Sequence, residues 1–137
     1  MSNSILDTLN ENQRTAATTI NEHVRIIAGA GSGKTRVLMA RIVYLVQDCG
    51  ILPNRILAIT FTNKAANEMK TRLTAQLGSM ASAVRISTIH SLCVRILRED
   101  ADLIGYPKTF AIMDPEDQKA ILKPIYKTLE VDKTTIS

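Results

Sequence analysis

The chain has 137 residues, 45% of them hydrophobic, and a formal net charge of +4, values ordinary for one globular domain with a sizeable core. No apolar run approaches the roughly 20 residues of a membrane-spanning helix, and the first residues lack the basic and apolar regions of a signal peptide. We therefore expect a cytoplasmic protein with Cys49 and Cys93 as reduced thiols, and the mildly basic charge permits a polyanionic partner without requiring one.

The first half of the chain alternates helical and extended patterns. Residues 10–19 predict a short helix, because Asn10 can cap it and Gln13 follows three residues later, as in a capping box. The β-branched residues at 24–27 predict a buried strand. Residues 34–47 predict an amphipathic helix.

The alternation continues in the second half. The expected elements are a buried strand at 56–61, a helix at 63–77, a strand at 84–87, a helix at 88–104, a short extended piece at 110–113 and a final helix. Asp114 should cap this last helix, and Pro124 should kink or interrupt it. Strands that alternate with amphipathic helices indicate an α/β fold with a parallel sheet flanked by helices.

Apolar residues at helical spacing predict the buried face of each longer helix. The expected faces are Val37, Leu38, Ile42, Leu45 and Val46; Ala66, Met69, Leu73 and Leu77; and Ile89, Leu92, Cys93, Ile96 and Leu97.

A glycine-rich run follows the first predicted strand and opens a helix. It reads Ala28-Gly29-Ala30-Gly31-Ser32-Gly33-Lys34-Thr35. Its glycines let backbone N–H groups approach phosphate oxygens, and the helix directs its positive end to the same place. Lys34 can reach the β- and γ-phosphates, and the Thr35 hydroxyl can ligate Mg²⁺. The run predicts a nucleotide site, against the less favoured alternative of a chance glycine-rich turn.

Two residues have competing interpretations. Gln13 can simply complete a helix cap, which its spacing favours, or its amide can also read an adenine edge. Asp114 can be the acidic end of a strand that serves a metal, or the cap of the helix that follows, which the sequence Asp-Pro-Glu-Asp favours.

Four segments in order carry a resemblance to a known family. They are residues 9–13, 28–35, 59–69 and 87–92. With them the chain resembles the N-terminal part of the UvrD/PcrA/Rep helicases of superfamily 1, and PcrA-like members in particular, over residues 6–118. The third segment, Ile59-Thr60-Phe61-Thr62-Asn63-Lys64-Ala65-Ala66-Asn67-Glu68-Met69, is the most specific, because phosphate loops are widespread.

The resemblance implies a RecA-like P-loop NTPase fold. Residues 1–110 would be part of domain 1A, and residues 111–137 the start of the helical subdomain 1B. It implies ATP and Mg²⁺ as cofactors and 3′–5′ translocation on single-stranded DNA, with unwinding at duplex junctions in DNA repair or replication. Gln13 would contact adenine, and Arg36 would lie beside the base.

The resemblance also assigns a path for single-stranded DNA. Phe61 would lie close to a base, Thr62 and Asn63 near the backbone, and Thr88 and His90 would add contacts. An aromatic platform and phosphate contacts without base readout suit a protein that tracks DNA of any sequence. Without the resemblance, the residue types and their positions would favour Phe61 as a core residue and His90 as a surface or capping residue.

In the family, the acidic pair that activates water and the arginine finger come further along the chain. We therefore expect a fragment without turnover of its own, which self-associates through an exposed sheet edge. The alternatives are a small P-loop phosphotransferase that uses Asp114, and a non-catalytic nucleic-acid-binding module with a vestigial phosphate loop.

Overall fold

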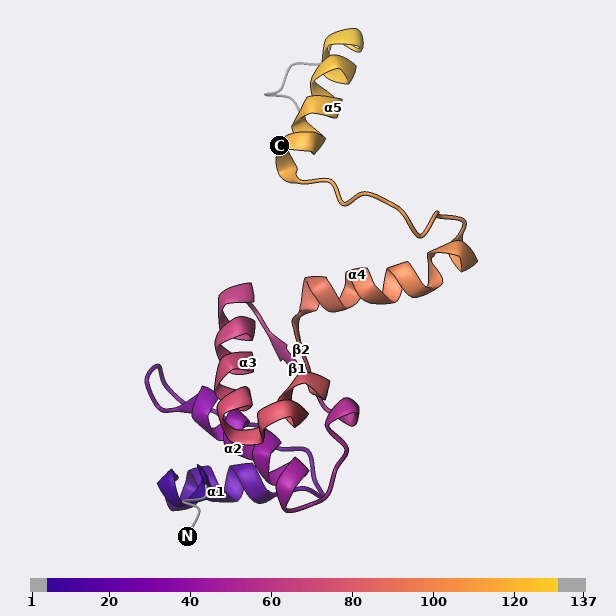
Figure 1. Cartoon of the computed structure of the whole chain (residues 1–137). Helices are drawn as coiled ribbons and strands as arrows, with labels where there is room; N and C mark the ends of the chain where they lie inside the picture. The colour runs from indigo at the N-terminus through magenta and orange to yellow at the C-terminus, as the bar shows by residue number, and fades with distance from the viewer. Residues whose placement is uncertain (1–4, 131–137) are drawn as a thin grey trace. The chain divides into compact units, whose positions relative to one another are not determined.

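The computed structural model describes residues 5–130 (Figure 1). In chain order its elements are a 3₁₀ helix (Ile5–Thr8), α1 (Glu11–Thr18), α2 (Lys34–Gln47), a 3₁₀ helix (Pro53–Arg55), β1 (Leu57–Thr60), α3 (Asn63–Leu77), a 3₁₀ helix (Gly78–Ala83), β2 (Arg85–Thr88), α4 (Ile89–Asp100), a 3₁₀ helix (Ala101–Ile104) and α5 (Pro115–Thr128). The chain divides into two compact units, one up to Cys93 and one from Val94, which are described separately. Among the described helices, none is long and apolar enough to cross a membrane.

A parallel pair of strands, β1 and β2, forms the sheet of the first unit. Their register runs from Leu57 opposite Arg85 to Thr60 opposite Thr88. Parallel neighbours need a crossover connection, and α3 with the 3₁₀ helix after it provides that connection. The structure confirms the α/β class, with a helix linking two parallel strands.

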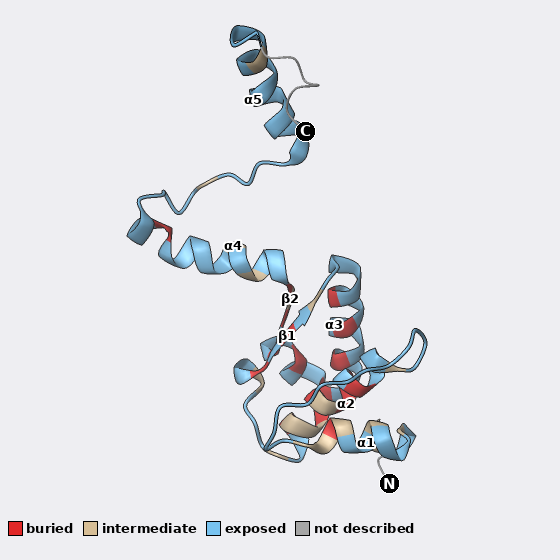
Figure 2. Cartoon of the chain, turned by 180° about the vertical axis from the view of Figure 1, so that it is seen from behind, coloured by how far each residue is buried: buried red, intermediate tan, exposed pale blue. Residues whose placement is uncertain are grey.

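The core of the first unit lies between α3, α2 and one face of the sheet. The four α3 residues expected on its buried face are all buried, and Leu73 is fully so. Ala58 of β1 and its partner Ile86 of β2 lie in the same apolar cluster. The buried residues of α2 and α3 appear red in Figure 2. Burial of this face supplies most of the favourable free energy of folding in such a domain.

A second, smaller cluster joins α1 to α2. Ala17 of α1 packs against Val37 and Ala40 of α2, and all three are buried. Asn10 caps α1 in the predicted capping box. The cap and the small residues together fix where the first helix begins and how closely it approaches the second.

The predicted strand at 24–27 is wrong. The described residues form a two-stranded sheet of β1 and β2, and residues 24–27 belong to neither strand. Val24, Ile26 and Ile27 are exposed instead of buried. Their β-branched side chains favour extended backbone, but a strand also needs a neighbour for its N–H and C=O groups, and no described segment pairs with this one. Residues 110–113, expected as a short extended piece, belong to neither strand of the sheet.

Burial is overestimated in three elements. Leu57 and Ile59 of β1 are 48% and 45% exposed, so that strand buries one face only. Leu38 of α2 is exposed, and α4 buries none of its apolar stripe. The predicted helix at 88–104 ends as an α-helix at Asp100 and continues as a 3₁₀ turn. Helical spacing shows which side chains share a face, whereas burial needs a second element over that face.

The helix α5 of the second unit begins as predicted and continues past its proline. Asp114 caps it in a capping box with Asp117. Pro124 does not interrupt it, because α5 extends to Thr128. A proline removes one backbone hydrogen bond, and on an exposed helix water can serve the carbonyl group that is left without a partner.

Candidate nucleotide and DNA site

The glycine-rich loop leads directly into α2. Gly33 is the residue before α2, and both it and Gly31 have left-handed backbone, with φ of 86° and 75°. Side chains with a Cβ rarely adopt this conformation. The two glycines therefore let the loop turn back on itself and direct the free N–H groups of the first turn of α2 outward.

Lys34 folds back over this loop. Its Nζ donates to the carbonyl oxygens of Ala28 and Gly29, at 2.9 and 2.6 Å. Ser32 closes the same turn, because its hydroxyl donates to the Gly29 carbonyl at 2.7 Å. The ammonium group is thus held at the loop by two backbone oxygens, which phosphate oxygens could replace as charge-assisted acceptors.

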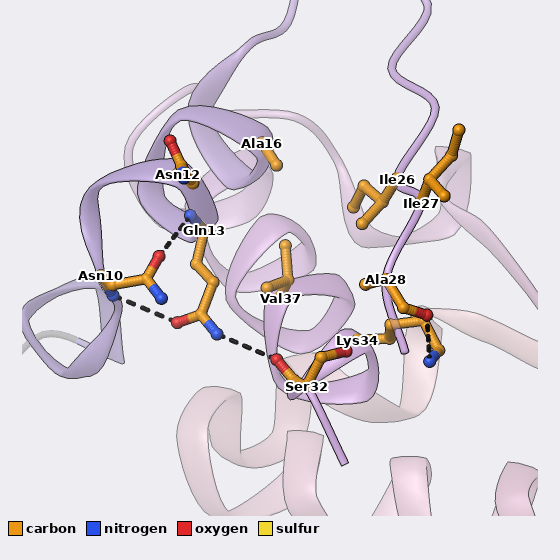
Figure 3. Close-up of a pocket in the computed structure, with 10 residues that line it drawn as sticks. All are labelled: Asn10, Asn12, Gln13, Ala16, Ile26, Ile27, Ala28, Ser32, Lys34 and Val37. Carbon is orange, nitrogen blue, oxygen red and sulfur yellow. Dashed lines mark hydrogen bonds between the residues drawn. The ribbon is translucent and has the colours of Figure 1, made fainter. Parts of the chain in front are cut away.

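Gln13 joins α1 to the loop at a cavity of about 190 Å³ (Figure 3). Its Oε1 accepts from the Asn10 backbone N–H at 3.1 Å, and its own N–H donates to Asn10 Oδ1 at 2.9 Å. Its Nε2 donates to the Ser32 carbonyl oxygen at 3.1 Å. The capping interpretation of Gln13 is confirmed, and the contact with adenine stays a prediction.

The cavity at Gln13 combines apolar walls with a few polar groups. Its lining residues are Asn10, Asn12, Gln13, Ala16, Ile26, Ile27, Ala28, Ser32, Lys34 and Val37. The segment that failed to form a strand therefore contributes an apolar wall beside the loop. Apolar side chains beside an amide group are chemistry suited to a purine ring.

Thr35 and Arg36 lie on other cavities. Thr35 lines one of about 300 Å³ together with Thr60 of β1 and Glu68 of α3. Arg36 lines one of about 210 Å³ with Arg72 of α3 and is absent from the lining of the Gln13 cavity. The structure thus does not bring Arg36 to Gln13, and its place beside a base stays a prediction.

The two segments expected to contact DNA leave the sheet at the same edge. Because β1 and β2 are parallel and Thr60 pairs with Thr88, the residues after each strand emerge side by side. Phe61 comes directly after β1, and its side chain is 90% exposed. The alternative that Phe61 belongs to the core is therefore wrong.

The polar residues of these segments differ in accessibility. Thr62 caps α3 by accepting from the Ala65 N–H at 3.1 Å, and Asn63 opens that helix on the surface. His90 is exposed on the first turn of α4. Thr88 is 6% exposed, and its hydroxyl lies 2.9 Å from the Ser91 hydroxyl and accepts from the Ser91 N–H. Its observed contacts are those of a structural residue at the start of α4.

Sequence reasoning missed three participants. The backbone carbonyl oxygen of Ser32 accepts a hydrogen bond from the Gln13 amide, and no pattern of side chains predicts such a contact. Glu68 lines the Thr35 cavity and pairs with Arg72, an acidic and a basic residue at helical spacing. Arg41 contacts the end of α1 through the carbonyl oxygens of Ala16 and Thr19. The contacts of Ser32 and Arg41 join segments far apart in the sequence, so local spacing does not signal them.

The acidic residues within residues 5–130 form no metal-binding group, and Asp114 has a structural role. That part of the chain holds no group of three or more His, Cys, Asp or Glu residues placed to bind a metal ion. The Asp114 carboxylate accepts from the N–H groups of Glu116 and Asp117, each at 2.8 Å. The interpretation of Asp114 as a helix cap is confirmed.

Comparisons with known proteins identify the family of this chain. Residues 9–137 match the model of the UvrD/REP helicase N-terminal domain. The chain is 49% identical over 130 residues to the ATP-dependent DNA helicase PcrA of Staphylococcus aureus (strain Mu50) and, equally, to that of Staphylococcus epidermidis. Each alignment covers 95% of this chain and 18% of the relative, so the chain spans about a fifth of the length of these relatives. The chain therefore belongs to the UvrD/REP helicase N-terminal domain family, with its RecA-like α/β fold.

Proposed function

We propose that this chain is the ATP-binding and single-stranded-DNA-binding part of an ATP-dependent 3′–5′ DNA helicase. One observation carries the proposal: Thr35 at the start of the phosphate-loop helix and Thr60 at the end of β1 line the same cavity. Thr60 directly precedes the exposed Phe61. A nucleotide at the loop would contact Thr35, and a DNA base at Phe61 would lie next to Thr60, which shares a cavity with Thr35. Such proximity would let ATP binding influence the contact with DNA, as a motor that moves on DNA requires.

The phosphate loop would hold the triphosphate of ATP. The backbone N–H groups from Ala28 to Gly33 and the start of α2 would surround the phosphates. Lys34 would exchange its two carbonyl acceptors for phosphate oxygens. Gln13 would read the adenine edge at its cavity, and Arg36 would lie beside the base.

The Thr35 hydroxyl would contribute to Mg²⁺ binding. It is an exposed oxygen donor at the first turn of α2, and oxygen is the donor that Mg²⁺ prefers. Bound Mg²⁺ would neutralise charge on the phosphates. The residues at the loop thus fit the phosphate-facing side of such an ion, while the described carboxylates form no cluster for its other side.

The DNA path would follow the edge where β1 and β2 end. Phe61 would stack on a base, a contact that contributes about 1–3 kcal/mol and tolerates any sequence. Thr62 and Asn63, at the start of α3, and His90 would lie near the phosphodiester backbone. Thr88 would position this segment from its buried place.

The activity of the whole protein follows by analogy with its relatives. Those relatives are named ATP-dependent DNA helicases, and we propose the same activity here, at duplex junctions in DNA repair or replication. A cytoplasmic location is proposed with it, on the two free cysteines and the DNA partner. The 137-residue chain alone should bind nucleotide and turn it over negligibly, because residues 5–130 hold no group of three or more His, Cys, Asp or Glu residues placed to bind a metal ion.

Binding measurements on the chain test this proposal. A fluorescent ATP analogue and a labelled single-stranded oligonucleotide should both bind, by titration and by anisotropy. Lys34→Ala should weaken the nucleotide and spare DNA, whereas Phe61→Ala should weaken DNA and spare the nucleotide. DNA binding by a chain that binds no nucleotide would instead favour a module with a vestigial loop. Phosphate transfer that is lost in Asp114→Asn would favour a phosphotransferase.

A further inference from the structure

The helices α1 and α2 lie side by side and contact each other at three places. Going from the start to the end of α1, these contacts are met in the same order as going from the start to the end of α2. At the first level, Gln13 donates to the carbonyl oxygen of Ser32, just before α2. At the second, Ala17 packs against Val37 and Ala40. At the third, Arg41 reaches the end of α1. The two helices therefore run in the same direction, with Gln13 and Arg41 at opposite ends of the contact.

The middle level sets the distance between the helices. Ala17 and Ala40 are both fully buried, so the helices approach closely there. Val37 and the partly buried Ile5, Leu6 and Leu9 pack around the two alanines. Apolar packing of this kind is not directional, so the hydrogen bonds at the two ends add a directional constraint on the register of α1 on α2.

Arg41 makes the contact at the far end. Its Nη1 donates to the carbonyl oxygen of Ala16 at 3.0 Å, to that of Thr19, and more weakly to that of Ala17 at 3.5 Å. Carbonyl groups in the last turn of a helix lack partners within the helix and carry its negative end. The guanidinium group is partly buried, so solvent screens this contact less than a surface ion pair.

We propose that Arg41 is a positioning residue for base recognition: by holding the end of α1, it sets the Gln13 amide over the phosphate loop. This inference rests on the proposed ATP site, because the Gln13 amide matters only if a base lies there. Without Arg41, the end of α1 loses its directional contact with α2, α1 can shift or rotate on its apolar contacts, and Gln13 leaves the Ser32 carbonyl. The phosphate loop itself, which starts α2, keeps its shape.

The decisive variant is Arg41→Met, which keeps the length of the side chain and removes its donors. Arg41→Lys keeps a charged donor. Arg55→Met removes one positive charge at an exposed arginine outside α1 and α2. The first measurement is the NMR signal of the Gln13 side-chain amide in the nucleotide-free chain. The second is the preference for ATP over inorganic tripolyphosphate, which has no base.

Arg41→Met should move the Gln13 amide signal toward that of a solvent-exposed glutamine. It should also reduce the preference for ATP about fivefold, the value of one hydrogen bond, with tripolyphosphate affinity within about twofold. Arg41→Lys should restore most of both effects, and Arg55→Met should change neither. In a Gln13→Ala background, Arg41→Met should reduce the preference no further.

An unchanged Gln13 signal in Arg41→Met would overturn the inference, as would an equal loss of ATP and tripolyphosphate affinity. If the unmutated chain binds neither, the proposed ATP site fails, while the Gln13 signal still decides what Arg41 does. If Arg41→Met does not fold, Arg41→Gln gives the same comparison, because its neutral amide is too short to reach the three carbonyl groups.

Discussion

Gln13 Nε2 donates to the carbonyl oxygen of Ser32 across 3.1 Å and 19 positions of sequence. The same side chain closes the capping box of α1 through its Oε1. Both hydrogen-bonding groups of the amide are thus used inside the protein. An adenine base that binds the Gln13 amide must therefore replace its hydrogen bond to Asn10 or to Ser32. Because Ser32 belongs to the phosphate loop, base binding would change a contact of that loop.

Substitutions at Gln13 separate its two contacts. Gln13→Ala removes both and should lower the free energy of unfolding by about 1 kcal/mol, the usual cost of a lost cap. Gln13→Glu keeps the acceptor for Asn10 and loses the donor to Ser32, so it should retain more of the stability. Both variants should weaken ATP relative to tripolyphosphate. Denaturant unfolding and nucleotide titration measure these effects, and full ATP preference in Gln13→Glu would show that the donor is not needed.

Gly33→Ala should lower nucleotide affinity by more than its effect on the free energy of unfolding would explain. Gly33 has φ of 86°, and an added Cβ would lie 3.2 Å from Gln13 Nε2. The matched control is Gly50→Ala, which has φ of 67° and nothing within 4 Å of its Cβ. Both should lose about 1–2 kcal/mol from backbone strain. Nucleotide affinity should fall in Gly33→Ala alone, and an equal fall in Gly50→Ala would assign the effect to general destabilisation.

Local signals in the sequence predicted the helices well. The bounds of α2 and α3 agree with the structure, and the caps at Asn10 and Asp114 form as expected. Caps and helical spacing act within a few residues, so the sequence alone contains them. The predicted burial of Leu73 follows from the same spacing.

Features that depend on distant partners could not be predicted. Ile27 has strand-forming composition, yet it is 84% exposed and has no neighbouring strand. Arg41 acts on carbonyl oxygens of another helix, which no motif encodes. The phosphate loop could be recognised because its glycines satisfy a local backbone requirement. The 90% exposure of Phe61 depends instead on which elements cover the end of β1, and these are distant in the sequence.

Phe61→Ala should weaken single-stranded DNA without destabilising the chain. The side chain is 90% exposed, so little apolar burial is lost in the folded state. Loss of one stacking contact should cost about 1–3 kcal/mol of binding free energy. Phe61→Trp should restore it, and Leu103→Ala, which removes another side chain that is 80% exposed, should have no effect. Fluorescence anisotropy measures the affinity, and equal affinity in Phe61→Ala would remove Phe61 from the DNA path.

Leu73→Ala should be the costly substitution in the core. Leu73 is fully buried between α3 and its neighbours, and its truncation should cost about 2–5 kcal/mol. Leu57→Ala, on the exposed face of β1, is the matched leucine control and should cost much less. Thermal or denaturant unfolding compares them. Similar losses at both positions would mean that Leu57 is covered in solution.

Self-association is expected through the exposed edge of the sheet, and the uncovered face beside that edge should add to the contact. Leu57 and Ile59 alternate with the buried Ala58 on β1, and both are about half exposed. In a two-stranded sheet each strand also has an edge with unpaired N–H and C=O groups. We expect the chain to form dimers or larger assemblies at high concentration in light scattering. The double variant Leu57→Lys and Ile59→Lys should shift it toward monomer, because two charges would then be buried at the contact. A monomer at every concentration in the unmutated chain would contradict this prediction, and association that survives both lysines would place the contact elsewhere.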